Sequence, residues 1–370
     1  MREILLVAGE ASGDLHAGRV VEGLAARRPD LTLVGVGGAY MERAGVRLIA
    51  HAEQLAVMGF VGVLKHLPKH WLLLRELKAR IDTGNVALVI LLDYPGLNLK
   101  VAEVARRAGV PVLYYITPQV WAWGANRLPQ IARVVTKAAC ILPFEEALLR
   151  AHGVDATFVG HPLLDRAQSL PTMHHARAEL GLAENAEVLA VFPGSRRSEL
   201  ARHLEPFVET AKELQRRRPE LRVVVSVAPT VRISAADCPF PLVHGASFTV
   251  LRAATAGLLK SGTTTLEAAV AGLPHVIGYR TSRLEYAIAS RLVKIPRIGL
   301  VNVVADREVS REFVQDAFQP RHVADALEPL LTIRSAARAD AIDALAGVRA
   351  QLGTAGAADR VVEMALGLLA

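Results

Sequence analysis

Short runs of consecutive apolar residues recur along this chain, separated by longer stretches that mix apolar and polar residues. Residues 4–8 read Ile-Leu-Leu-Val-Ala, and residues 86–92 read Val-Ala-Leu-Val-Ile-Leu-Leu. A strand that is apolar at every position is covered on both of its faces, which is typical of parallel sheets. Because the runs alternate with helix-like stretches, the sequence predicts an α/β fold with right-handed crossovers.

The apolar runs form two series on either side of a linker that extends from about residue 160 to residue 182 and contains Pro162 and Pro171. The expected strands are 4–8, 31–36, 86–92, 112–116, 139–142 and 157–159, then 188–192, 221–227, 242–244, 256–259 and 275–278. At 370 residues the chain is long enough for two domains. We therefore expect two Rossmann-like domains, 1–165 and 166–340, with a ligand cleft between them. Helices in 341–370 would pack back on the first domain or on a dimer partner.

The composition limits the classes of partner. A formal net charge of +7 favours anionic ligands such as phosphates, nucleotides or acidic lipids. Aromatic residues make up only 5% of the chain, which argues against a stacking surface for nucleic acid. Two cysteines fit a reducing compartment, and no apolar run is long enough to cross a bilayer. We expect a cytoplasmic protein, either free or bound to a membrane face.

Common cofactor motifs are missing. A dinucleotide fingerprint reads Gly-x-Gly-x-x-Gly, whereas residues 35–40 read Gly-Val-Gly-Gly-Ala-Tyr, with tyrosine at the position of the third glycine. The chain also has no P-loop sequence. His66 and His70 are four residues apart, but Pro68 lies between them and no third ligand is near. We expect neither a metal nor another cofactor.

Two segments of the first half follow expected strands and carry chemistry. The turn Gly9-Glu10-Ala11-Ser12-Gly13-Asp14 combines glycines with ionisable groups at a helix N-terminus. Its plain alternative is a tight turn capped by Ser12. Asp93 stands at the carboxyl end of a fully apolar strand, which is a favoured place for a catalytic acid or base. Its alternative is a cap for the next helix, or a residue that opens the Pro95-Gly96 turn.

Aromatic and apolar residues gather in two further segments of the first half. Gln119 and Trp121 belong to Thr117-Pro118-Gln119-Val120-Trp121-Ala122-Trp123, where rings could stack on a sugar or an acyl chain, or simply pack the loop. Residues 58–75 alternate large apolar side chains with Lys and His. This pattern is typical of an interfacial element that binds lipid, or of a core helix with a basic edge. The candidate lipid contacts are Met58, Phe60, Val61, Val63, Leu64, Trp71 and Leu72.

Two segments of the second half are suited to phosphate. Gly194, Ser195 and Arg196 open a strand-to-helix turn, where backbone N–H groups and a guanidinium would meet an anion. Ser261, Gly262 and Thr263 open another, with Glu267 one helical turn further on. Glu267 would accept hydrogen bonds from ribose hydroxyls, or would cap its own helix, since Thr264-x-x-Glu267 matches a capping box. A donor held by its phosphates in the second half, and an acceptor with a base in the first, is the layout of a nucleotide-sugar glycosyltransferase.

In this order, the segments resemble the lipid-A-disaccharide synthase family from near residue 1 to about residue 316. The resemblance is carried by the segments above together with Leu142-Pro143-Phe144-Glu145, Val159-Gly160-His161, Asn302 and Arg307-Glu308. It implies the GT-B fold and a metal-independent inverting transfer from UDP-2,3-diacylglucosamine to 2,3-diacylglucosamine 1-phosphate (lipid X). The products would be lipid A disaccharide 1-phosphate and UDP. It also implies a peripheral enzyme on the inner face of the inner membrane of Gram-negative bacteria, able to dimerise through C-terminal helices.

The resemblance assigns roles to particular residues. Asp93 would be the general base, with Glu10 as its rival. Arg196 would meet the donor diphosphate together with Gly194 and Ser195. Ser12 and Gly13, Ser261, Gly262 and Thr263 would help to hold UDP, Glu267 would hold its ribose, and Asn302 would lie in the cleft. The sequence departs from the family pattern after Asp93, at Gly62 and at Pro162. These departures bear on which acyl chains the enzyme selects more than on the reaction itself. Another UDP-sugar enzyme of this fold, a peptidoglycan-precursor GlcNAc transferase or a UDP-GlcNAc 2-epimerase, is the alternative, and a basic membrane- or nucleic-acid-binding module is the non-enzymatic one.

Overall fold

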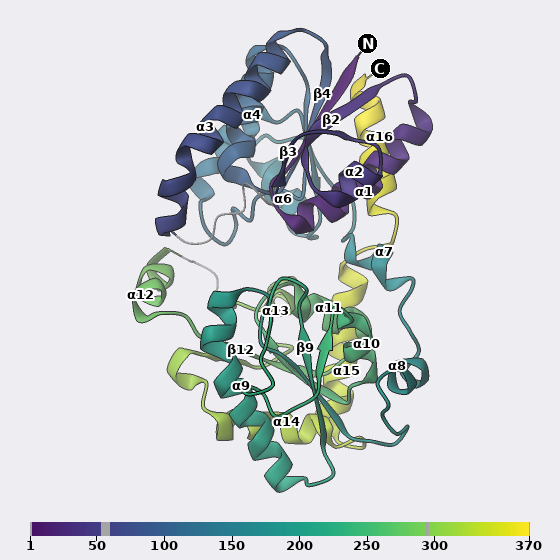
Figure 1. Cartoon of the computed structure of the whole chain (residues 1–370), viewed down its shortest axis with the longest axis vertical. Coiled ribbons are helices and arrows are strands. Elements are labelled where there is room, and N and C mark those ends of the chain that lie inside the picture. Colours follow the sequence, from purple (N-terminus) through teal and green to yellow (C-terminus); the bar gives the residue numbers. More distant parts are fainter. Residues whose placement is uncertain (1, 53–59, 293–295, 370) are drawn as a thin grey trace. The chain divides into compact units, whose positions relative to one another are not determined.

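The protein is described by a computed structural model that covers residues 2–52, 60–292 and 296–369. It divides into two compact units (Figure 1). Unit 1 comprises Met1–Asp165 and Gly353–Ala370, and unit 2 comprises Arg166–Leu352. The sequence placed the second boundary at residue 340. The structure places it at Leu352, because the helix α15 (Ala336–Gln351) belongs to unit 2.

Unit 1 is built on a parallel sheet whose strands are hydrogen-bonded in the order β3-β2-β1-β4-β5-β6-β7. The strands are β1 (Glu3–Ala8), β2 (Thr32–Gly37), β3 (Arg47–His51), β4 (Val86–Leu92), β5 (Val112–Tyr115), β6 (Lys137–Cys140) and β7 (Ala156–Phe158). The helices are α1 (Ala11–Arg27), α2 (Ala39–Arg43), α3 (Phe60–Asp82), α4 (Pro95–Arg107), α5 (Leu128–Val134), α6 (Glu145–Ala151), α7 (Leu163–Ala167, which runs into unit 2) and α16 (Ala357–Leu369), with a 3-10 turn at Ala125–Arg127.

Alternate residues of these strands feed two apolar layers, one on each face of the sheet. Tyr114 contributes to the layer covered by α3, α4 and α5. Its neighbour Tyr115 contributes to the opposite layer, which is covered by α1 and α16. Helix α16 (yellow) lies beside α1 (purple) in Figure 1. Val361 and Val362 of α16 are buried there, so the C-terminal segment completes the core of unit 1.

Unit 2 contains a second parallel sheet with the order β10-β9-β8-β11-β12-β13. Its strands are β8 (Val188–Phe192), β9 (Arg222–Val227), β10 (Leu242–His244), β11 (Ala256–Lys260), β12 (His275–Tyr279) and β13 (Glu312–Val314). The helices, besides α15, are α8 (Met173–Glu179), α9 (Arg197–Arg217), α10 (Ser247–Ala253), α11 (Thr263–Ala271), α12 (Arg283–Leu292), α13 (Leu300–Ala305) and α14 (Pro320–Leu331), with a 3-10 turn at Gln315–Ala317.

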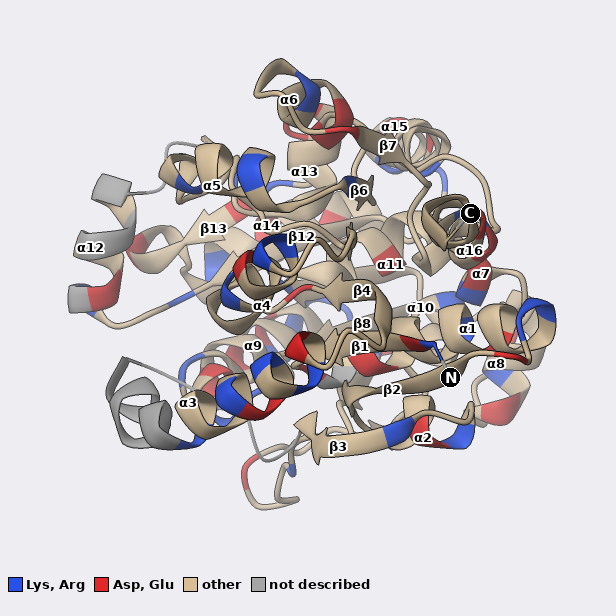
Figure 2. Cartoon of the chain, turned by 90° about the horizontal axis from the view of Figure 1, so that it is seen from above, with Lys and Arg blue, Asp and Glu red and all other residues tan. Residues whose placement is uncertain are grey.

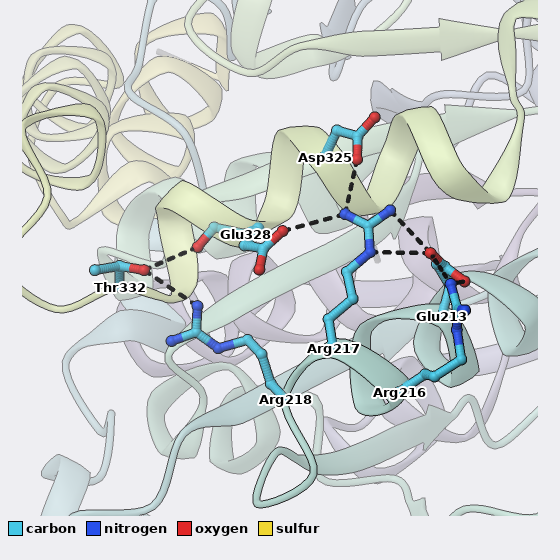
Figure 3. Close-up of polar contacts among 7 residues, drawn as sticks. All are labelled: Glu213, Arg216, Arg217, Arg218, Asp325, Glu328 and Thr332. Carbon is cyan, nitrogen blue, oxygen red and sulfur yellow. Dashed lines mark hydrogen bonds and ion pairs between the residues drawn. The ribbon is translucent and has the colours of Figure 1, made fainter.

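Apolar and charged contacts both join α9 to α14 in unit 2. Phe207 of α9 packs in one core layer with Val323 and Leu327 of α14. Beyond that layer, Arg217 donates to Asp325 at 2.7 Å and to Glu328 at 3.1 Å (Figure 3). These partners are solvent-accessible, so each ion pair adds little stability and the apolar layer holds the helices together. Elsewhere, too, charged residues lie mainly on helices and at strand ends (Figure 2).

Every expected strand is present, to within two residues at each end. Two strands, β3 and β13, were not expected. Both lie at an edge of their sheet and are only partly buried, so neither is an uninterrupted apolar run. The burial that makes the inner strands easy to predict is weaker at a sheet edge.

Candidate functional site

In each unit, one pair of adjacent strands marks the point where the strand order reverses. From β1 the chain proceeds to β2 and β3 on one side and returns to β4 on the other; from β8 it proceeds to β9 and β10 and returns to β11. The paired strands end level with each other, since Ala8 is opposite Leu92 and Phe192 is opposite Leu259. Ligands of open α/β sheets bind outside the carboxyl ends of the strands at such switch points. The loop Gly9–Asp14 therefore meets Asp93, and Gly194–Arg196 meets Ser261–Thr263.

The first loop of unit 1 has little freedom. Glu10 is the half-buried N-cap of α1, with extended backbone, and Ser12 is exposed. Asp14, which the sequence grouped with the chemical residues of this turn, is buried and structural. Its carboxylate accepts backbone N–H bonds from Gly38 at 2.7 Å and from Tyr40 and Met41 at 3.0 Å. Asp14 thereby caps the start of α2 and ties the loop after β1 to the loop after β2.

Asp93 lies immediately beyond β4 with a left-handed backbone, φ +47°, and Tyr94 follows with φ +45°. Left-handed non-glycine residues are strained by about 1–3 kcal/mol each and collect at functional sites. The Asp93 carbonyl accepts hydrogen bonds from Asn98 Nδ2 at 2.8 Å and from the Tyr114 hydroxyl at 2.6 Å. The sequence indicates Asp93 but not its partners Asn98 and Tyr114. Their side chains bind a backbone carbonyl, and such a contact leaves no motif in the sequence.

Tyr94 connects the Asp93 turn to α3. Its hydroxyl oxygen lies 2.6 Å from Nε2 of His70, and the two rings stack with centroids 6.0 Å apart. Burial and the nearby charge of Glu10 raise the pKa of Tyr94. The loops beyond β1 and β4 thus bring together Glu10, Asp93 and Tyr94. A substrate hydroxyl bound there would lie near a carboxylate.

The aromatic loop after β5 is fixed by the loop after β6. Trp121 Nε1 donates to Glu145 at 3.0 Å, and the indole packs edge-on to Phe144 with centroids 5.2 Å apart. Glu145 is buried and also accepts the Leu142 N–H at 3.1 Å; burial raises its pKa to about 7. Trp121 is half-buried, whereas Gln119 is exposed. The loop thus combines a fixed indole with an accessible amide.

The expected lipid contacts fall into two groups. Met58 lies outside the described residues, and Phe60, Val61, Val63 and Leu64 lie in the first turns of α3, where the side chains are not described. Trp71 and Leu72 of α3 are 60% and 55% exposed, so two large apolar side chains lie next to each other on the surface. The Arg75 guanidinium lies 5.6 Å from the Trp71 ring centroid, so a basic group accompanies the exposed indole.

In unit 2, the expected phosphate loop after β8 already surrounds a carboxylate. Glu199 accepts the N–H groups of Ser195 at 2.9 Å and Arg196 at 3.3 Å, and it pairs with Lys260 at 2.9 Å. Gly194 has φ +132°, and a side chain there would meet Glu199. The Arg196 side chain is about half exposed. The sequence analysis did not identify Glu199 or Lys260 as site residues. Glu199 could have been predicted, because it lies three residues after the N-cap Arg196, which is the spacing of a capping box.

The second loop of unit 2 also differs in detail from expectation. Ser261 donates its hydroxyl to the Ile298 carbonyl at 2.7 Å, Gly262 has φ +148°, and Thr263 is exposed at the start of α11. Glu267 does not form the capping box that the spacing allowed. Its buried carboxylate pairs with Arg166 at 3.2 Å, and burial, partly offset by Arg166, raises its pKa.

Asn302 is buried and its amide is fully used inside unit 2. Nδ2 donates to the Ser310 carbonyl at 2.6 Å and to Glu312 at 2.8 Å, while Oδ1 accepts the N–H groups of Val309 and Ser310. Glu312 in turn accepts the Gly299 N–H at 2.9 Å. The sequence predicts that Asn302 helps to hold the donor, and in the structure its side chain braces the segment next to the Ser261 loop.

Solved structures with the same arrangement identify the fold. A UDP-GlcNAc 2-epimerase from Neisseria meningitidis bound to UDP-GlcNAc has a TM-score of 0.67 at 13% identity, covering 99% of this chain and 100% of that one. The calicheamicin glycosyltransferase CalG4 has a TM-score of 0.64 at 16% identity, covering 100% and 98%. At this identity the similarity shows the fold alone, which is the GT-B fold.

Sequence comparison identifies the family. A model of the lipid-A-disaccharide synthetase family matches residues 4–351. The lipid-A-disaccharide synthases of Anaeromyxobacter dehalogenans (strain 2CP-C) and Myxococcus xanthus (strain DK1622) are 43% and 39% identical, each covering 99% of this chain and 97% of the relative. The chain belongs to the lipid-A-disaccharide synthetase family and is a glycosyltransferase of lipid A synthesis. Its similarity to epimerases does not extend beyond the fold.

Proposed function

We propose that the enzyme transfers the diacylglucosaminyl group of UDP-2,3-diacylglucosamine to the 6-hydroxyl of lipid X. The acceptor oxygen forms a bond to the anomeric carbon, the bond from that carbon to the UDP oxygen breaks, and the acceptor proton passes to a carboxylate. The observation that carries the proposal is the held, left-handed turn that presents Asp93 at the switch point of unit 1, in a chain of this family.

Asp93 is the general base of this proposal. It follows a rigid buried strand, and its backbone is fastened by two side chains. A base fixed in this way reaches the reacting hydroxyl without reorganisation. Glu10, in the adjacent loop, is the rival, and its proposed part is to accept a hydrogen bond from the acceptor or the donor sugar.

The donor is assigned to unit 2. The exposed Arg196 guanidinium would pair with the diphosphate and stabilise the charge that develops on departing UDP. Gly194, Ser195, Ser261, Gly262 and Thr263 would line the diphosphate, and Glu267, oriented by Arg166, would accept the ribose hydroxyls. Ser12 and Gly13 would approach the donor from unit 1. We now assign Asn302 a positioning role behind these loops.

The acceptor and the membrane are assigned to α3 and the aromatic loop of unit 1. Gln119 and Trp121 would contact lipid X, and the exposed Trp71 and Leu72 would enter the lipid headgroup region of the inner membrane. No helix in the described ranges is both long and apolar enough to cross a bilayer. A homodimer through the C-terminal helices remains a prediction.

One assay tests the reaction. The purified enzyme is incubated in detergent with UDP-2,3-diacylglucosamine and lipid X, and the products are separated by mass. We expect UDP and a disaccharide 1-phosphate in equal amounts, and no disaccharide when lipid X is omitted. Conversion of UDP-GlcNAc to its C2 epimer, without a disaccharide, would instead support the epimerase alternative.

Substitutions in the same assay test the residue roles. Asp93→Asn and Arg196→Ala should each lower turnover at least about 100-fold, because each removes one acid–base or charge-stabilising group. The Arg196 variant should still fold, since its side chain is exposed, and thermal unfolding provides that control. Near-normal turnover of Asp93→Asn would transfer the base role to Glu10.

A further inference from the structure

We propose that Tyr114 and Asn98 are positioning residues for the transfer reaction, because they hold the backbone of Asp93 in the left-handed conformation that aims its carboxylate. This inference rests on the proposed role of Asp93 as the base. Neither residue belongs to a loop of the site: Tyr114 lies within β5 and Asn98 within α4.

The geometry concentrates two donors on one backbone atom. The Asp93 carbonyl receives the Tyr114 hydroxyl at 2.6 Å and Asn98 Nδ2 at 2.8 Å. Asn98 Nδ2 also lies 3.0 Å from the Leu92 carbonyl and 3.3 Å from the Val7 carbonyl, so it bridges the ends of β1 and β4. Both side chains are fully buried, which removes the competition of water for these bonds.

The turn itself is not what helix formation requires. Tyr94 is the N-cap of α4, yet it has left-handed backbone and makes no side-chain cap hydrogen bond. A Ser, Thr, Asp or Asn with extended backbone would cap the helix without strain. The strained pair Asp93–Tyr94 persists because the Asp93 carbonyl is held from two elements, and such over-determined strain is typical of functional sites.

The neighbouring residue supplies a matched control. Tyr115 is as fully buried as Tyr114 but belongs to the apolar layer on the opposite face of the sheet. Its hydroxyl has no hydrogen-bond partner within the part of the chain that the structure describes. Tyr115→Phe therefore removes the same atom from the same strand without touching the Asp93 turn.

The primary test compares Tyr114→Phe and Tyr115→Phe in the purified full chain with both substrates. We expect Tyr114→Phe to lower kcat about 10- to 100-fold with each KM within about twofold, since the carboxylate is misplaced in the transition state while the binding surfaces remain. Tyr115→Phe should stay within twofold of the parent in kcat. Equal kcat values for the two variants would overturn the inference.

A double-mutant cycle separates positioning from general structural support. In an Asp93→Asn background, Tyr114→Phe should change the residual kcat less than twofold, because the group that it positions is already gone. A full, multiplicative loss in that background would overturn the inference. If Tyr114→Phe fails to fold, Asn98→Ala is carried through the same cycle with the same expectation.

The cycle also distinguishes the two proposals. If Asp93→Asn retains near-normal turnover, the base assignment fails, and the inference fails with it. If Asp93→Asn is inactive while Tyr114→Phe retains near-normal turnover, only the positioning inference fails and the base assignment stands. Thermal unfolding of each variant shows whether the fold survives. If Tyr114 had a purely structural role, the loss of activity would be accompanied by a loss of thermal stability.

Discussion

At the scale of single residues, Gly9 is packed tightly against the ring of Tyr94 beside the site. A Cβ atom at Gly9 would lie 2.3 Å from two ring carbons of Tyr94. Real Cβ atoms do not approach so closely, so a side chain at Gly9 would force the Tyr94 ring away. The ring of Tyr94, which follows β4, therefore explains why residue 9 is a glycine. The sequence of the first loop alone could not predict this contact.

Gly9→Ala should consequently displace Tyr94 and, with it, the Asp93 turn. We expect turnover to fall about tenfold or more, and the free energy of unfolding to fall by about 1–3 kcal/mol, as for other overpacked sites. Activity assays and urea unfolding measure the two effects. Gly96→Ala is the control, because no atom of the described residues outside its own helix turn lies within 4 Å of the added Cβ; it should retain activity. Unchanged turnover in Gly9→Ala would contradict the proposed rigidity of the Asp93 turn.

At the scale of elements, the inner strands and the loops that follow them could be predicted from the sequence, whereas the residue pairs that organise these loops could not. A strand buried on both faces leaves a continuous apolar run, which is a local signal. The pairs Trp121–Glu145 and Arg166–Glu267 join residues 24 and 101 positions apart. They become predictable only when the strand order and the register are known.

Helix α3 carries two adjacent large apolar side chains, Trp71 and Leu72, that are exposed. The combined variant Trp71→Ser, Leu72→Ser should bind vesicles of phosphatidylethanolamine and phosphatidylglycerol much less than the parent protein, because two large apolar side chains no longer enter the interface. Sedimentation with vesicles measures binding. Ile333→Ser, at a 65% exposed position of unit 2, is the control and should sediment like the parent. Equal recovery of all three proteins would remove α3 from the membrane proposal.

At the scale of the whole molecule, both units repeat one design in which a sheet reverses its strand order and two loops meet at the reversal. The two series of apolar runs predicted this organisation. The apolar pattern did not predict β3 and β13, which are partly exposed edge strands. It also did not predict that the boundary after unit 2 lies at Leu352 and not at residue 340. The hydrophobic pattern shows that α15 is a helix, but not which of two apolar surfaces it covers.

Three histidines distributed over both units should make the molecule less stable in acid. Burial lowers the pKa of His161 to about 3 and those of His203 and His275 to about 4. Because these folded-state values lie below the unfolded value of 6.5, the stability from neutral histidines is present above pH 6.5 and is lost as the pH falls toward 4. Two buried carboxyl groups oppose this trend. The pKa of Glu145 is raised to about 7 and that of Glu267 is also raised, so their contributions to stability are lost as the pH rises.

With three histidines against the two carboxyl groups Glu145 and Glu267, the free energy of unfolding should fall between pH 6.5 and pH 5 by up to about 1.4 kcal/mol per pH unit for each net proton. Urea unfolding at several pH values measures the slope. His203→Gln should flatten it, whereas His244→Gln, at an exposed position, should not. A slope that is the same in all three proteins would show that other groups govern acid unfolding.

The return of α16 to unit 1 has a consequence for synthesis on the ribosome. Val361, Val362 and Ala365 complete an apolar layer whose other members lie between residues 4 and 159. All of unit 2 is translated between these two parts. The half of the protein that emerges first thus keeps an uncovered apolar face until the second half has emerged. Unit 1 is begun before unit 2 and finished after it, so chaperones that shield apolar surfaces can bind it while unit 2, about half of the 370 residues, is translated.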